Sequence, residues 1–123
     1  MRWRAWANWL WGFAAGCVLA SYVMLSCSDG NAQSAEVADA IEYGISMGLP
    51  PAWAWRVAYC ESRYSSGAYN RWSGASGLYQ FIPSTWRATP QGRAGLSPFD
   101  PYANAAAAAW LYRTGGPGHW SCR

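Results

Sequence analysis

The sequence predicts a small, mainly helical domain with a short irregular region of turns and strands, preceded by a hydrophobic N-terminal segment. Three observations support this prediction: apolar residues recur at helical spacing, residues 64–80 are rich in Gly, Ser, Asn and Tyr, and a long uncharged run follows the basic start of the chain. We divide the chain into a signal peptide or membrane anchor at 1–28, a polar linker at 29–34 and a domain at 35–123.

The N-terminal segment has the pattern of an export or membrane signal. Arg2 and Arg4 provide a positive start, and no charged residue follows between 5 and 28. Three fates are open: cleavage in the linker, lipidation at Cys27, or retention as an anchor that contacts the membrane. All three place the domain outside the cytoplasm, in the cell envelope or secreted.

Two helices are predicted in the first half of the domain. The first covers about 35–47, where Ser34 can cap its start and Gly48 ends it. The second begins near Pro51, which is favourable in a first turn, and ends at about Ser62.

The second half of the domain is predicted to contain turns and a long helix. Residues 64–80 are expected to form irregular strands and turns, 83–86 the start of a short helix, and 88–99 a loop rich in Pro and Gly. Asp100 is expected to cap a helix that ends near Gly115. The alanine run at 105–109 should let a neighbouring element approach this helix closely.

Glu61 is the candidate for acid–base chemistry. It is one of only two carboxylates from residue 44 onward, the other being Asp100. On the predicted helix, Ala54, Val57 and Ala58 precede Glu61 at a spacing that puts all four on one face. Because the carboxyl group ends an apolar face, we expect it to be partly withdrawn from water, as suits a general acid.

The charge of the domain favours an anionic partner. All nine basic residues of the chain are Arg. From residue 43 onward there are seven Arg and only two acidic residues, Glu61 and Asp100, which gives a formal charge of +5. The Arg residues are scattered with no basic run, so we expect no nucleic acid partner. An anionic cell wall suits the charge, and we expect the protein to act as a monomer.

The four cysteines divide into two pairs. Cys17 and Cys27 lie in the N-terminal segment, whereas Cys60 and Cys122 lie in the domain. Export makes a Cys60–Cys122 disulfide plausible, and by loop entropy it would stabilise the fold by about 4 kcal/mol. Two free thiols or a shared metal site are the alternatives, although one His and two Cys form a poor zinc set. We therefore expect no metal and no organic cofactor.

Three motifs then follow one another in a specific order. They are Cys60-Glu61-Ser62, Ser73-Gly74-Ala75-Ser76-Gly77-Leu78-Tyr79-Gln80-Phe81 and Ile82-Pro83-Ser84-Thr85-Trp86. Over about residues 37–122 the chain resembles the soluble-type (SLT) lytic transglycosylase domain of the lysozyme superfamily. It also resembles the resuscitation-promoting factors, which carry a Cys beside the catalytic Glu and a second Cys near the C-terminus. The resemblance implies a lysozyme-like α+β fold.

The resemblance also implies roles for individual residues. Glu61 would be the catalytic acid/base, and no second carboxylate is expected near it. The usual third motif, Ala-Tyr-Asn, is not clearly present, and Asn104 and Tyr112 are candidates for its roles. The residues expected to bind substrate are Gln80, Tyr79, Ser73 and Tyr112. Trp72 and Trp86 could stack on sugars or belong to the core.

The predicted function is cleavage of the β-1,4 bond between N-acetylmuramic acid and N-acetylglucosamine in peptidoglycan glycan strands. The resemblance favours attack by the sugar's own C6 hydroxyl, which leaves an anhydro end. A hydrolytic muramidase of the same fold and a non-catalytic wall-binding module are the alternatives.

Overall fold

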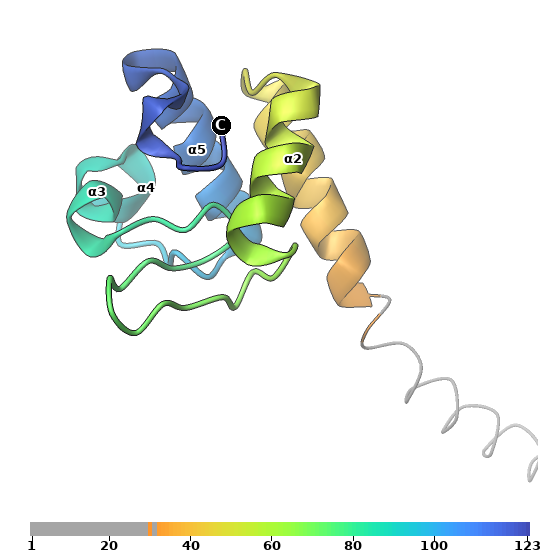
Figure 1. The fold of residues 1–123 in the computed structure, drawn as a ribbon, viewed down its shortest axis with the longest axis horizontal. Helices are drawn as coiled ribbons and strands as arrows, with labels where there is room; N and C mark the ends of the chain where they lie inside the picture. Colours follow the sequence, from red (N-terminus) through yellow and green to blue (C-terminus); the bar gives the residue numbers. More distant parts are fainter. Residues whose placement is uncertain (1–29, 31) are drawn as a thin grey trace, which may run out of the picture. The chain divides into compact units, whose positions relative to one another are not determined.

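The computed structural model describes residue 30 and residues 32–123 of the chain (Figure 1). The N-terminal segment predicted at 1–28 lies outside this part. Within residues 30 and 32–123, no helix is long and apolar enough to cross a membrane. Residues Ser34–Arg123 form one compact unit, and it is mainly helical, as predicted.

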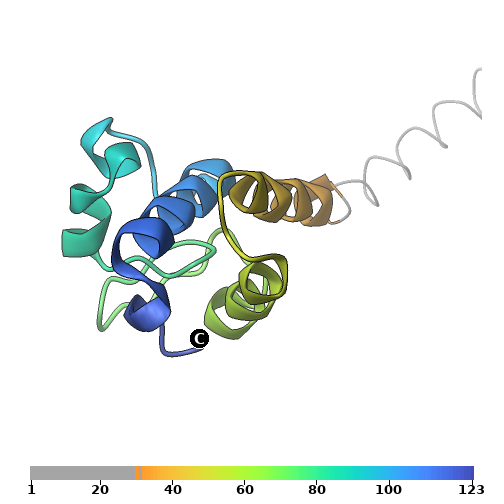
Figure 2. The same ribbon diagram turned by 90° about the horizontal axis from the view of Figure 1, so that it is seen from above.

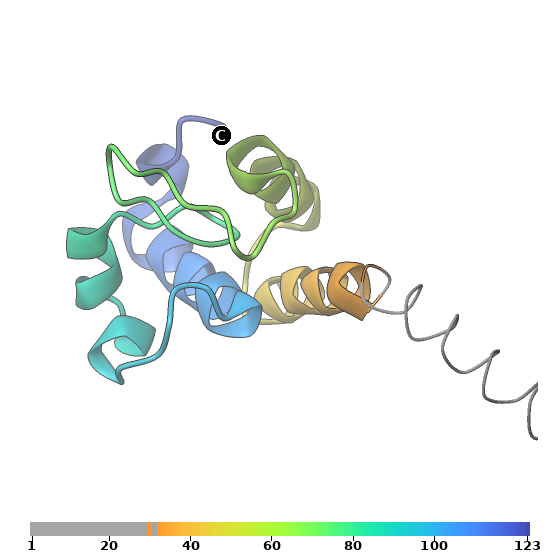
Figure 3. The ribbon, with the colours of Figure 1, turned by 90° about the horizontal axis from the view of Figure 1, so that it is seen from below.

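The compact unit is built around one long helix. A helix at residues 32–46 comes first. It is followed by α2 (Pro51–Ser62), α3 (Pro83–Ala88), α4 (Pro90–Arg93), α5 (Pro101–Gly115) and the short 3₁₀ helix η1 (Pro117–His119). In Figures 1, 2 and 3, α5 runs through the middle, with α3 and α4 on one side of it and helix 32–46 and α2 on the other.

The predicted helix boundaries are confirmed for α2 and nearly so for α5. Pro51 is the first residue of α2 and Ser62 the last. The Asp100 carboxylate accepts a hydrogen bond from the Ala103 N–H at 2.9 Å, so it caps α5 as predicted. The loop expected at 88–99 is wrong in part, because Thr89 caps the short helix α4 by accepting from the Gly92 N–H at 3.0 Å.

The first helix begins earlier than predicted. Residue 30 and residues 32–34, which belong to the predicted linker, are helical, so Ser34 is not an N-cap. Further along this helix Gly44 is buried, and a Cβ atom added there would lie 3.2 Å from the Ala105 Cβ of α5. The absence of a side chain at Gly44 and the small side chains of the alanine run therefore let the two helices pack closely, as the sequence suggested.

Aromatic side chains fill the space between α2, α5 and the C-terminus. Trp53 of α2 contacts Tyr112 and Trp120 edge-on, each with 4.9 Å between ring centroids. The Trp120 indole N–H donates to the Tyr79 carbonyl oxygen at 3.0 Å. These contacts compensate for the thin core of a small domain, because each aromatic ring buries a large apolar area.

The predicted disulfide joins the C-terminus to α2. Cys60 and Cys122 are bonded across 62 positions of sequence, with 5.9 Å between their Cα atoms. The bridge holds the chain end beside the C-terminal turn of α2 (Figures 2 and 3), and Cys60 is the residue before Glu61.

Candidate active site

Glu61 lies at the C-terminal end of α2, where the chain turns away sharply. The next two residues after the helix, Arg63 and Tyr64, have φ angles of 55° and 61°, which is the left-handed region. The Arg63 N–H donates to the Tyr59 carbonyl oxygen at 2.8 Å and closes the helix. This turn leaves the side of the last helical turn uncovered, so the Glu61 side chain is partly exposed there.

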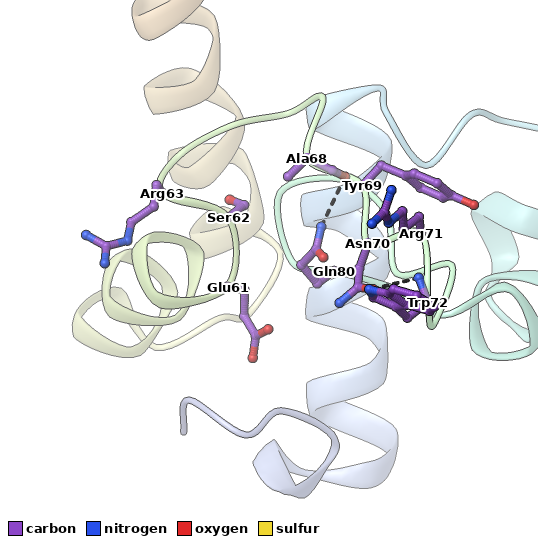
Figure 4. Close-up of a pocket in the computed structure, with 9 residues that line it drawn as sticks. All are labelled: Glu61, Ser62, Arg63, Ala68, Tyr69, Asn70, Arg71, Trp72 and Gln80. Carbon is purple, nitrogen blue, oxygen red and sulfur yellow. Dashed lines mark hydrogen bonds between the residues drawn. The ribbon is translucent and has the colours of Figure 1, made fainter.

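The Glu61 carboxylate has no partner among the described residues. It makes no hydrogen bond and no ion pair with any residue in the described part of the chain. The cation nearest in sequence, Arg63, is held elsewhere: its guanidinium donates to the Tyr59 hydroxyl at 2.5 Å and lies 4.7 Å from the centre of that ring. Figure 4 shows Arg63 directed away from Glu61, as expected for residues two apart on a helix.

An open groove of about 510 Å³ runs from Glu61 to the loop that follows α2 (Figure 4). Its far side is the segment 68–72 and its floor includes Gln80. Glu61 is the only carboxylate among the lining residues. The full lining is Glu61, Ser62, Arg63, Ala68, Tyr69, Asn70, Arg71, Trp72 and Gln80.

Gln80, which the sequence analysis expects to bind substrate, lines the groove, and its amide has a defined orientation. Its Nε2 donates to the carbonyl oxygens of Ala68 at 3.1 Å and Gly77 at 2.9 Å. Both donors are thereby used, and the Oε1 atom remains as an acceptor. Gln80 also has a φ of 52°, which is uncommon for a residue other than glycine and is held here by those hydrogen bonds.

Tyr79, by contrast, does not line the groove. Its side chain is 0% exposed, and its hydroxyl donates to the Ala54 carbonyl oxygen at 3.1 Å. Burial, with a smaller contribution from Tyr64, raises the pKa of the Tyr79 hydroxyl. Because Tyr79 and Gln80 are neighbours in one tight turn, their side chains point to opposite sides, and only Gln80 faces the groove.

Asn104 fixes this turn from the core. Its Oδ1 accepts from the Tyr79 N–H at 2.8 Å, and its Nδ2 donates to the carbonyl oxygens of Pro98 at 2.8 Å and Ser76 at 3.3 Å. The side chain is fully buried. Asn104 therefore positions the Gln80 turn against α5 and does not reach the groove.

The remaining two residues expected to bind substrate also lie outside the groove lining. Tyr112 is partly buried and packs edge-on against Trp53 in the core. Ser73 is exposed, but its hydroxyl oxygen accepts from the Ala75 N–H at 3.2 Å within its own turn. The structure therefore gives Tyr112 a role in core packing and Ser73 a role in its own turn.

Trp72 and Trp86, for which sugar stacking and core packing were the alternatives, have opposite environments. Trp86 is 7% exposed and packs on Phe81 in the core, whereas Trp72 is 87% exposed and lines the groove.

The sequence analysis did not identify the other lining residues of segment 68–72, notably Asn70 and Arg71. A signal was available, because they lie in the Gly- and Ser-rich stretch between Glu61 and Gln80.

The second carboxylate of this half of the chain belongs to a different surface. Asp100 caps α5 and lines a separate hollow of about 300 Å³ with Tyr43, Gln91 and Tyr102. The carboxylates of helix 32–46 do not line the Glu61 groove either; one of them, Glu42, accepts from the Trp55 indole N–H at 3.2 Å. Among the described residues, the groove therefore has one acidic group only.

The structure shows a small helical domain with an open groove that has a single carboxylate among its lining residues. Residues 37–114 match the family described as "Transglycosylase SLT domain", and the chain belongs to this family.

Curated relatives whose names include a transglycosylase activity match the chain over part of their length. The proteins named "Probable transglycosylase SceD" from Staphylococcus aureus strains Newman, USA300 and COL are each 46% identical to this chain over 72 residues. The aligned stretch covers 53% of this chain and 29% of each relative. No solved structure matches the chain significantly.

Proposed function

We propose that this chain is a lytic transglycosylase that cleaves the β-1,4 bond between N-acetylmuramic acid and N-acetylglucosamine, with Glu61 as its single acid/base. The observation that carries the proposal is the environment of Glu61: a partly exposed, unpartnered carboxyl group in an open groove with no second carboxylate. Membership of the SLT family and the names of the relatives support the reaction class.

The single carboxylate restricts the mechanism. Most glycosidases use two carboxylates, one as acid and one as nucleophile or base. N-acetyl sugars offer a substitute, because the oxygen of the 2-acetamido group can attack the anomeric carbon of the same sugar. Glu61 would protonate the glycosidic oxygen as the bond to the anomeric carbon breaks, and the leaving sugar would depart as an alcohol.

The second half of the reaction needs a base, and Glu61 has become one by then. Its carboxylate would take the proton of the C6 hydroxyl as that oxygen attacks the anomeric carbon and displaces the acetamido oxygen. The product is a 1,6-anhydromuramyl end, and Glu61 is again protonated. Attack by water in place of the C6 hydroxyl gives hydrolysis, which is the muramidase alternative.

Gln80 is proposed to orient the sugar. Its free Oε1 can accept a hydrogen bond from a sugar hydroxyl or an acetamido N–H, while its Nε2 stays bound to the backbone of Ala68 and Gly77. A hydrogen-bond acceptor fixed in this way costs no side-chain ordering when the substrate binds. Substrate is expected to reach the groove in the cell envelope, where the exported or membrane-anchored domain would act.

Replacement of Glu61 tests this proposal. Glu61→Gln keeps the shape of the side chain but removes the acidic proton, so the release of soluble fragments from purified peptidoglycan should fall by ~10²–10⁴-fold or more. Glu42→Gln makes the same chemical change outside the groove and should release fragments at the wild-type rate. If Glu61→Gln is folded and digests the wall nearly as fast as the wild type, Glu61 is not the acid.

A further inference from the structure

We infer that Arg71 and Trp72 form a binding platform that selects glycans carrying a carboxylate over neutral N-acetyl-sugar chains; the inference rests on the proposed function, since it specifies the substrate of the same groove. The platform consists of these two residues at the tip of the loop opposite Glu61 (Figure 4).

The tip is held by hydrogen bonds from the side chain and the backbone of Asn70. The Asn70 Oδ1 accepts from the N–H groups of Trp72 at 2.9 Å and Ser73 at 3.3 Å, and the Gly74 N–H donates to the Asn70 carbonyl oxygen at 2.7 Å. An antiparallel bridge between Tyr69 and Ser76 closes the base of the loop. The side chains at the tip therefore stand on an ordered turn, which lowers the entropic cost of binding a ligand there.

Trp72 lies outside the hydrophobic core and exposes its aromatic ring. It is 87% exposed, whereas Trp53, Trp86 and Trp120 are each below 9%. An exposed indole on a hydrogen-bonded turn at the edge of a groove presents a flat apolar surface of the size of a sugar ring. Since the same groove contains Glu61, the sugar that stacks on Trp72 belongs to the chain that Glu61 cleaves.

Arg71 adds a positive charge at that surface. Its guanidinium lies 5.1 Å from the centre of the Trp72 ring, and within the described residues it has no carboxylate partner. The Arg71 guanidinium also makes no hydrogen bond among the described residues, whereas the Arg63 guanidinium donates one to the Tyr59 hydroxyl. A planar guanidinium with free N–H groups matches a carboxylate. Muramyl sugars carry such a group, either on the lactyl ether or on the peptide attached to it, whereas N-acetylglucosamine chains carry none.

The test measures binding by the inactive Glu61→Gln chain, so that no ligand is consumed. Three tetrasaccharides are compared by titration calorimetry: peptidoglycan glycan with free lactyl carboxylates, the same glycan bearing stem peptides, and neutral chitotetraose. We expect Glu61→Gln to bind at least one acidic ligand about fivefold more tightly than chitotetraose, the size of a good exposed ion pair. Which acidic ligand is preferred tells whether the carboxylate is that of the lactyl group or of the peptide.

Two further substitutions separate charge from stacking. Adding Arg71→Gln should abolish the preference for the acidic ligand and leave chitotetraose binding unchanged. Adding Trp72→Ala should weaken the binding of all three ligands by about fivefold or more. Arg87→Gln, which removes an exposed Arg of α3 outside the groove, is the matched control and should change nothing.

The outcomes distinguish this inference from the proposed function. If the Arg71→Gln chain keeps the preference, or if Trp72→Ala binds as tightly as its parent, the platform is refuted even when the wild type cleaves peptidoglycan. If the wild type cleaves nothing but the binding pattern holds, the platform stands and the proposed catalytic function fails.

Discussion

Replacing Asn104 with Ala should destabilise the domain by about 3 kcal/mol. The change removes three hydrogen bonds and leaves the Tyr79 N–H and the Pro98 carbonyl oxygen without the partner they have now. The Ser76 carbonyl oxygen is less affected, since it also accepts from the Phe81 N–H at 3.0 Å. A buried polar group that loses its partner costs roughly 1–3 kcal/mol, and two such groups give the total.

The assay is urea unfolding followed by tryptophan fluorescence. A domain of this size is stable by roughly 5–10 kcal/mol, so the variant should still fold, with a Tm lower by roughly 15 °C. Gln91→Ala is the matched control, because the Gln91 amide oxygen is buried without a hydrogen bond and its removal should cost little. A change below about 0.5 kcal/mol for Asn104→Ala would refute the role given to this side chain.

Two further predictions concern the same core. Reduction of the Cys60–Cys122 disulfide should lower the free energy of unfolding by about 4 kcal/mol, because the bridge closes a long loop; equal urea midpoints with and without reductant would contradict it. Tyr79→Phe should cost about 1 kcal/mol at pH 7, through the lost hydrogen bond to Ala54. Burial raises the pKa of the Tyr79 hydroxyl, so the folded state favours its protonated form. The stabilisation that this hydroxyl contributes is complete below about pH 10, the ordinary pKa of a tyrosine, and is lost as the pH rises further. The deficit of the Phe variant should therefore shrink above pH 10, and parallel stability curves from pH 7 to 11 would show the reasoning to be wrong.

Local signals predicted most of the fold. Proline in the first turn marked the start of α2, whereas α5 was marked by its Asp100 cap, by Pro101 and by the glycines at its end. The same kind of signal was present at Thr89 and Pro90 but was outweighed by the surrounding Pro and Gly, so α4 was missed. The start of the first helix was misplaced because the polar composition of the linker does not by itself prevent helix formation.

The site was predictable only in part, for a physical reason. Glu61 and Gln80 could be chosen because motifs mark them, and both lie in the groove. Tyr79 occupies the same motif but is buried, because alternate sides of a tight turn face the core and the groove. Arg71 and Trp72 belong to none of the motifs. Their Gly- and Ser-rich surroundings indicate a turn near Glu61, but not that hydrogen bonds to Asn70 would place them opposite Glu61.

If Glu61 forms anhydro ends on peptidoglycan, mass analysis of the released fragments will detect them. Purified peptidoglycan is digested with the full chain and with Glu61→Gln, and the soluble muropeptides are separated and weighed. We expect the wild type to release fragments with 1,6-anhydromuramyl ends, which are lighter by one water than the corresponding reducing ends, and the variant to release none. Fragments with reducing ends would contradict the transglycosylase assignment in favour of a hydrolytic muramidase, and no fragments from the wild type would indicate a wall-binding module.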